Sequence, residues 1–164
     1  MNRGESVDES RLRLYIEKYH GTVFRVAYSY VKNREDGEDI AQEAFLRLYN
    51  SDIDFKTDEN AKAWLIRVSI NLAKDMLKSS WLKGRTELDR DIPYENKEES
   101  IMLDCIHRLK PEYCSVILLY YYEGYSAKEI AEILRISPTL VTTRLSRARK
   151  QLKEMLLKEG YYEE

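Results

Sequence analysis

Apolar residues recur at intervals of three and four positions along most of the chain, the spacing that gathers them on one side of an α-helix. Stripes of this kind begin at Leu12, Ile40, Ala61 and Ile101, and others follow in the last third of the chain. Runs that alternate apolar and polar residues, as half-buried strands do, are few. The pattern therefore predicts an all-α protein.

Three helices are expected within residues 11–85, over about 12–32, 36–50 and 57–80. Residues 1–10 are polar and are predicted to be disordered. A polar loop, residues 50–60, joins the second helix to the third and contains one aromatic residue, Phe55. The residues alone favour an ordinary anchoring role for Phe55.

The third of these helices carries apolar residues on two sides, so that only a narrow polar ridge is left. Arg67, Asn71, Lys74 and Lys78 form this ridge at steps of four, three and four. Basic side chains can neutralise phosphates, and an Asn amide can pair with the edge of a base. Spacing alone favours the other reading, a basic face in contact with water.

Residues 86–100 have no helical stripe, contain Pro93 and carry an excess of acidic residues. These features are typical of a linker between domains. The sequence thus predicts two small helical domains, residues 11–85 and 101–160, joined by a flexible acidic linker. In the second domain Pro111 is expected to open a helix, and the apolar run 116–122 is expected to be its buried centre.

A helix-turn-helix is predicted in residues 124–156. Ser126 followed by Glu129 is a capping box, which starts a helix, and Gly124 can end the helix before it. After a turn at Arg135, a second helix begins with Ser137 as its cap and a proline at its first position. Its predicted buried stripe consists of Val141, Leu145, Ala148 and Leu152.

The second helix of this motif is basic on its outer side. Residues 137–153 include no Asp or Glu and five Arg or Lys. An acid-free basic helix after a capped turn is typical of a recognition helix that enters the major groove of DNA. The alternative is a basic surface helix without a partner.

Composition limits the remaining possibilities. The 164 residues are 43% hydrophobic and 34% charged, with a net charge of −2, which fits a soluble chain and argues against non-specific coating of DNA. No apolar run is long enough to cross a bilayer, and the N-terminus lacks the apolar core of a signal peptide, so the protein is expected to be cytoplasmic.

Few residues in the chain suit catalysis or metal binding. The two cysteines, Cys105 and Cys114, and the two histidines, His20 and His107, match no zinc or disulfide spacing. No Ser–His pairing or phosphate-binding glycine loop is found, so neither an enzyme nor a metal or other cofactor is predicted.

Two segments of the chain together resemble one family. The first is DGEDIAQEAFLRLYN, residues 36–50, with the aromatic residue at 55 and WLIRVSINLAKD at 64–75; the second is residues 109–152. In this order they resemble the extracytoplasmic-function (ECF) sigma factors of the sigma-70 family. The resemblance implies a subunit that binds core RNA polymerase and directs it to promoter DNA, which it helps to open. It also implies an anti-sigma factor as a partner.

The resemblance assigns residues to three surfaces. The surface implied to bind core polymerase consists of Asp39, Gln42, Glu43, Phe45 and Leu46. The −10 element is implied to be read by Phe55, Arg67, Asn71, Lys74 and Lys78, with a flipped base held near Phe55. The −35 element is implied to be read by Thr142, Thr143, Arg144, Arg147, Arg149 and Lys150.

An alternative uses the same helix-turn-helix in another class of protein. A transcription regulator that binds operator DNA as a dimer would also need a basic recognition helix. It would carry a dimerisation or ligand-sensing domain before that helix, which residues 12–85 do not resemble.

Overall fold

The computed structural model describes residues 7–83 and 97–161, and within these residues every regular element is a helix. The all-α prediction is therefore confirmed. The chain divides into two compact units, Met1–Glu87 (unit 1) and Leu88–Glu164 (unit 2). Most of the predicted linker, residues 86–96, lies outside the described residues.

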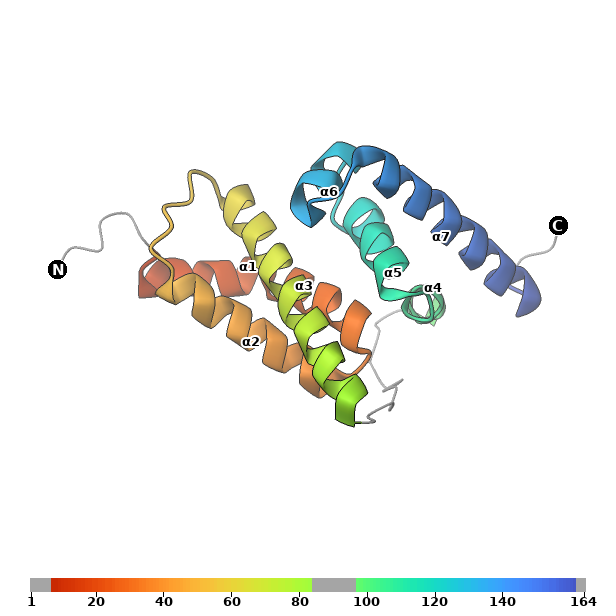
Figure 1. Ribbon diagram of the computed structural model, residues 1–164, viewed down its shortest axis with the longest axis horizontal. Helices are drawn as coiled ribbons and strands as arrows, with labels where there is room; N and C mark the ends of the chain where they lie inside the picture. The colour runs from red at the N-terminus through yellow and green to blue at the C-terminus, as the bar shows by residue number, and fades with distance from the viewer. Residues whose placement is uncertain (1–6, 84–96, 162–164) are drawn as a thin grey trace. The chain divides into compact units, whose positions relative to one another are not determined.

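Unit 1 consists of three helices that pack against one another: α1 (Glu9–Val31), α2 (Arg34–Asn50) and α3 (Asp58–Lys83) (Figure 1). α1 and α2 approach closely at Gly37, where an added Cβ would lie 3.0 Å from the ring of Phe24. A Cβ at this position would require the Phe24 ring to shift by a few tenths of an ångström. The core of the unit is built from all three helices and includes Tyr15, Val23, Ala44, Leu48, Ala61 and Leu65.

Residues 7–10 are ordered, in contrast to the prediction of disorder over residues 1–10; residues 1–6 lie outside the described residues. Val7 is only 1% exposed and belongs to the same apolar cluster as Leu12. Asp8 caps α1 by accepting a hydrogen bond from the backbone N–H of Arg11 at 2.8 Å. A buried apolar residue just before the cap and another in the first helical turn form a hydrophobic staple. One apolar residue in a polar stretch is therefore enough to anchor this segment.

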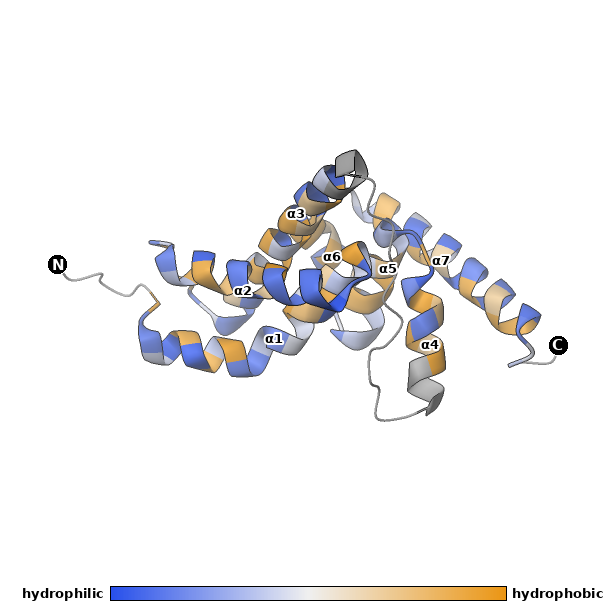
Figure 2. Ribbon diagram, turned by 90° about the horizontal axis from the view of Figure 1, so that it is seen from below, coloured by the Kyte–Doolittle hydropathy of each residue, from blue (hydrophilic) through white to orange (hydrophobic). Residues whose placement is uncertain are grey.

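Unit 2 consists of α4 (Lys97–His107), α5 (Pro111–Ile117), the short π-helix η1 (Leu118–Tyr122), α6 (Ala127–Leu134) and α7 (Pro138–Lys158). α4 begins at residue 97, so the last four residues of the predicted linker are helical. Along α7, hydrophobic and hydrophilic positions alternate with helical spacing (Figure 2). The core of the unit includes Cys105, Ile106, Cys114, Val116, Leu119, Ile130, Val141 and Leu145.

The expectation that residues 116–122 form a buried centre holds only for the first four. The residues from Val116 to Leu119 are buried, whereas Tyr120, Tyr121 and Tyr122 are exposed. These tyrosines lie in η1, where the backbone N–H of Glu123 bonds to the carbonyl of Leu118, five residues back. A tyrosine can be exposed because its hydroxyl forms hydrogen bonds with water. Counting the three tyrosines as apolar residues therefore overestimated the length of the buried run.

Candidate functional site

The helix-turn-helix in unit 2 is held by local hydrogen bonds. The Ser126 backbone N–H donates to Glu129 Oε1 at 3.0 Å, and the Glu129 N–H donates to Ser126 Oγ at 3.1 Å, so the predicted capping box is confirmed. The bond from the Ser126 N–H lowers the pKa of the Glu129 carboxyl. Arg135 adopts a left-handed conformation with φ of 57° and ends α6. Ser137 then caps α7, accepting from the Leu140 N–H at 3.1 Å.

The predicted stripe of α7 is confirmed as buried: it consists of Val141, Leu145, Ala148 and Leu152. Burial of this stripe fixes which side of α7 faces away from the unit. Arg147 and Lys150 lie on the outer side, are exposed, and make no hydrogen bond or ion pair within the described residues. The middle of α7 therefore offers two cations that are available to an anionic partner.

Other basic and polar residues of α7 are partly engaged within unit 2. Arg144 is half-buried, with its Nη2 atom 4.0 Å from Oε2 of Glu112. Thr142 is exposed, and its hydroxyl donates to the backbone carbonyl of Thr139 at 2.9 Å. Thr143 is half-buried. Of the six residues implied to read the −35 element, Arg147 and Lys150 thus project most freely.

The polar ridge of α3 has its expected exposure at three of four positions. Asn71, Lys74 and Lys78 are exposed, whereas Arg67 is half-buried and engaged in an interaction within the chain. On the other side of the same helix, Leu65, Ile66, Ile70 and Ala73 are buried in the core. The ridge is therefore a polar strip on a helix that is fixed by its apolar sides.

Phe55 lies in the loop between α2 and α3 and is only 7% exposed. Its ring meets the ring of Trp64 edge-on, with centroids 5.8 Å apart and planes at 67°. Phe55 also belongs to the apolar cluster of unit 1, so it fastens the loop to α3. In this conformation little of the ring is open to a stacked base.

A shallow groove of about 350 Å³ lies between α1 and α2, and it includes four of the five residues implied to bind polymerase. Phe45 is 4% exposed and belongs to the floor, whereas Leu46 is 48% exposed. Asp39 and Gln42 are exposed on the same helix. The fifth residue, Glu43, accepts a hydrogen bond from Arg47 Nε at 3.1 Å.

The α1 side of this groove was not predicted from the sequence. Ile16 and His20 line it, and His20 Nε2 lies 2.9 Å from Glu38 Oε2. Ile16 is exposed although it is apolar, and it stands at the i+4 position from Leu12. Because Ile16 continues the apolar spacing that begins at Leu12, the sequence alone does not mark it as exposed.

Comparison with known proteins matches both units. The chain matches the family Sigma-70 region 2 over residues 15–82 and the family Sigma-70, region 4 over residues 100–152. It is 31% identical to RNA polymerase sigma factor SigV of Bacillus subtilis over 142 residues, which cover 83% of this chain and 85% of that protein. The chain belongs to the sigma-70 family. Within that family it belongs to the ECF sigma factors.

Further relatives agree with this assignment. The chain is 27% identical to the ECF RNA polymerase sigma-E factor of Haemophilus influenzae, with 95% of this chain and 93% of that protein covered. The sigma factor RpoE from Bartonella quintana, solved with the anti-sigma factor NepR, shares the fold with a TM-score of 0.74 at 21% identity over 88% of this chain and 95% of that one. CnrH, solved with the cytosolic domain of CnrY, gives a TM-score of 0.69 at 21% identity over 93% of this chain and 92% of that one.

As an ECF sigma factor, the protein is a transcription-initiation factor and not an enzyme: it binds core RNA polymerase and directs it to promoters. The comparisons give no support to a dimeric operator-binding regulator. Among the described residues, no three His, Cys, Asp or Glu side chains gather as a metal site would require. No helix in residues 7–83 and 97–161 has the length and apolar character needed to span a bilayer.

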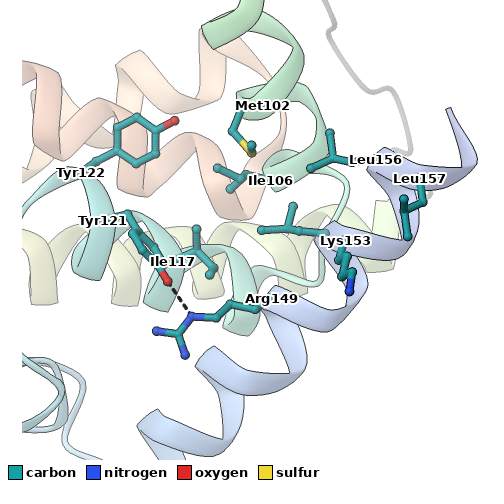
Figure 3. A pocket seen from close by; sticks show the side chains of 10 residues that line it. Met102, Ile106, Ile117, Tyr121, Tyr122, Arg149, Lys153, Leu156 and Leu157 are labelled. Carbon is teal, nitrogen blue, oxygen red and sulfur yellow. Dashed lines mark hydrogen bonds between the residues drawn. The ribbon is translucent and has the colours of Figure 1, made fainter. Parts of the chain in front are cut away.

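One basic residue of this sigma factor is placed differently from the others on α7. Arg149 Nε donates to the hydroxyl of Tyr121 at 2.5 Å, and its guanidinium lies 5.5 Å from the ring centroids of both Tyr120 and Tyr121. Figure 3 shows the Arg149 side chain reaching from α7 toward Tyr121 across a groove of about 940 Å³. Sequence reasoning missed these tyrosines; three consecutive aromatic residues before Gly124 were the signal.

Proposed function

We propose that this sigma factor uses α2 to bind core polymerase, the ridge of α3 to read the −10 element, and the outer side of α7 to read the −35 element. One observation carries the proposal most directly: Arg147 and Lys150 are exposed and free on a helix whose buried side is fixed by a capped helix-turn-helix. A cation that is not paired within the protein can replace the counterions of a phosphate or donate to a base edge.

The surface for core polymerase is proposed to be the exposed part of α2 and the groove beside it. Leu46 offers apolar surface, Asp39 and Gln42 offer polar groups around it, and Phe45 supports them from below. Interfaces of this kind combine an apolar centre with a polar rim. Glu43, which is paired with Arg47, is proposed to act at the edge of the surface.

For the −10 element, Asn71 is proposed to pair with a base and Lys74 and Lys78 to contact the backbone, because all three are exposed on one strip of α3. Arg67 is proposed to contact the backbone from the edge of the strip. Phe55 is proposed to form the wall of a base pocket, with its ring held in place by Trp64. Because the ring is 7% exposed in this structure, the loop is proposed to shift when a flipped base binds, which opens the ring for stacking.

For the −35 element, Arg147 is proposed to read a base and Lys150 to contact a phosphate. Thr142 and Thr143 stand on the earlier turns of the same helix, where a recognition helix enters the groove. Arg144, which lies near Glu112, is proposed to contribute positive charge where α7 comes close to the DNA backbone.

We also propose that the protein acts in the cytoplasm, where polymerase and DNA are found, and that an anti-sigma factor regulates it. The sigma factor RpoE, which shares its fold, was solved with NepR, which is named as an anti-sigma factor, and CnrH, which also shares the fold, was solved with the cytosolic domain of CnrY. The apolar groove beside α2 would be a target for such a protein, because covering it would compete with polymerase.

Run-off transcription on genomic fragments with purified core polymerase tests the proposal. The protein should make core polymerase initiate at a defined set of fragments, and Arg147→Ala should reduce initiation only at fragments with an intact −35 element. Binding to DNA as a dimer without polymerase, with no gain of initiation, would contradict the proposal.

A further inference from the structure

Arg149 is held by two aromatic residues that precede the helix-turn-helix. Its Nε atom donates to Tyr121 Oη at 2.5 Å, and its guanidinium lies over the rings of Tyr120 and Tyr121 at 5.5 Å from each centroid. The two rings are themselves edge to face, with centroids 4.9 Å apart and planes at 72°. Arg149 therefore uses one of its five N–H donors, and its cation–π contacts with two rings, within unit 2.

The π-helix η1 explains why two consecutive tyrosines reach the same guanidinium. In an α-helix, neighbouring side chains point about 100° apart, which separates residues i and i+1. The i→i+5 turn of η1 is wider, so successive residues are less widely splayed. Gly124, with φ of 75°, comes two residues after the end of η1 and precedes α6. Single π-turns of this kind are often found at functional sites.

The position of Arg149 on α7 separates it from the two free cations. At about 100° per residue, Arg149 lies roughly 40° from the buried Leu145, whereas Arg147 lies roughly 200° from it. Lys150 shares the outer side with Arg147. Arg149 thus stands on the flank of α7 that faces η1, and its contacts join residues 28 positions apart in the chain.

We propose that Arg149 is a positioning residue: the clamp formed by Tyr120, Tyr121 and Arg149 fixes the rotation of α7 about its own axis. The apolar stripe alone sets this rotation loosely, because aliphatic contacts are not directional. A hydrogen bond with a fixed donor direction and two ring faces adds the missing constraint. Arg147, two residues before Arg149, is then held at the angle that a base contact requires. This role replaces a direct part in reading the −35 element, which the family resemblance implied for Arg149.

The inference rests on the proposed reading of the −35 element, and the experiment separates the two. Holoenzyme reconstituted from the full chain and core polymerase is bound to a promoter found by run-off transcription, and to the same promoter with its −35 element scrambled. Affinities are measured over a series of salt concentrations. The variants are Tyr121→Phe, which changes no charge, Arg149→Ala, and their combination, with Lys150→Ala as the control for a lost phosphate contact.

The clamp predicts that Tyr121→Phe lowers the preference for the intact −35 element over the scrambled one by roughly three- to ten-fold. This is the change in affinity that the net free energy of one hydrogen bond gives. Arg149→Ala lowers this preference at least as far, and the double variant lowers it no further than Arg149→Ala does. For all three variants, the dependence of affinity on salt concentration keeps the wild-type slope. Lys150→Ala instead lowers the slope by about one and keeps the preference.

Two results would overturn the clamp. If Arg149→Ala lowers the salt slope by about one and Tyr121→Phe leaves the preference for the intact −35 element unchanged, Arg149 contacts a phosphate instead. A lower melting temperature with neither preference nor slope altered would make the cluster merely structural. If the wild-type holoenzyme ignores the −35 element altogether, it is the proposed reading of that element that fails.

Discussion

The Nζ atom of Lys18 lies 3.0 Å from Oδ2 of Asp58, so an ion pair joins the middle of α1 to the first residue of α3. Forty positions separate the two residues in the chain. The pair therefore fastens the end of the loop that carries Phe55. We therefore expect the stability of unit 1 to depend on pH in both acid and alkali.

The hydrogen bond from the Lys18 ammonium lowers the pKa of Asp58 from its usual 3.8, and the same bond raises the pKa of Lys18 from 10.5. The contribution of Asp58 to stability is therefore present above pH 3.8 and is lost as the pH falls through its lower folded value. The contribution of Lys18 is present below pH 10.5 and is lost as the pH rises further. Asp58→Asn should flatten the acid limb of a melting-temperature profile, whereas Asp54→Asn, in the exposed loop, should not. An unchanged acid limb would show that the pair contributes nothing.

Val7→Ser should lower the free energy of unfolding by about 1–3 kcal/mol, because Val7 is buried against the core of unit 1. Urea unfolding of the full chain, followed by circular dichroism, measures the change. Ile53→Ser is the matched control, since Ile53 is an exposed aliphatic residue of the same unit. If both variants unfold like the wild type, the segment before α1 is not anchored in solution.

Leu46→Ala should weaken binding to core polymerase by about 1–2 kcal/mol and leave the fold intact, because this side chain is 48% exposed. Leu14→Ala removes an equally large side chain that is 55% exposed on α1, and it is not among the residues that line the groove. Affinity for core polymerase in a fluorescence titration distinguishes the two. Equal losses, or none, would place the polymerase surface elsewhere.

Asn71→Ala should reduce promoter opening while binding to core polymerase is unchanged. The amide offers both a donor and an acceptor to one base, a pairing worth about 1–3 kcal/mol. Permanganate reactivity of unpaired thymines in the −10 region reports opening. Ser79→Ala, at another exposed position of α3, is the control. Normal opening by Asn71→Ala would remove the base-reading role.

Arg147→Ala and Lys150→Ala should fail in different ways in holoenzyme. Loss of a base contact should cost about 1–3 kcal/mol on the preferred −35 sequence and relax the preference there. Loss of a phosphate contact should weaken all sequences alike and lower the salt slope by about one. Both residues are exposed on the outer side of α7, so neither change should alter stability by more than about 0.5 kcal/mol. Equal losses on intact and scrambled −35 elements for Arg147→Ala would disprove its role as a base reader.

Features that depend on a few neighbouring residues could be predicted from the sequence. The capping box at Ser126 and Glu129, the proline after Ser137 and the buried stripe of α7 are each set by the backbone of one helix. The all-α fold follows from the sum of such signals. The family resemblance supplied the expected role of the ridge of α3. Periodicity could not supply it, because a basic ridge has the same spacing whether it faces water or DNA.

Features that depend on distant neighbours could not be predicted in this way. The burial of Val7 requires the core that the three helices of unit 1 build together, and the clamp on Arg149 joins residues 28 positions apart. The residues alone favour an anchoring role for Phe55, in agreement with its burial, but they do not identify Trp64 as the ring that it contacts. A π-turn also shifts the phase of a helix, so that a count in steps of three and four misplaces the tyrosines of η1.

The reactivity of the two cysteines can be used to measure the opening of unit 2. Cys105 and Cys114 are both thiols that are not disulfide-bonded, neither has exposed surface, and both lie in unit 2. Burial raises the pKa of the Cys105 thiol, which leaves it even less thiolate to react with an alkylating reagent. Alkylation of the native protein can proceed only when unit 2 opens, whatever unit 1 does. Labelling rates therefore report how often unit 2 opens, without any engineered probe.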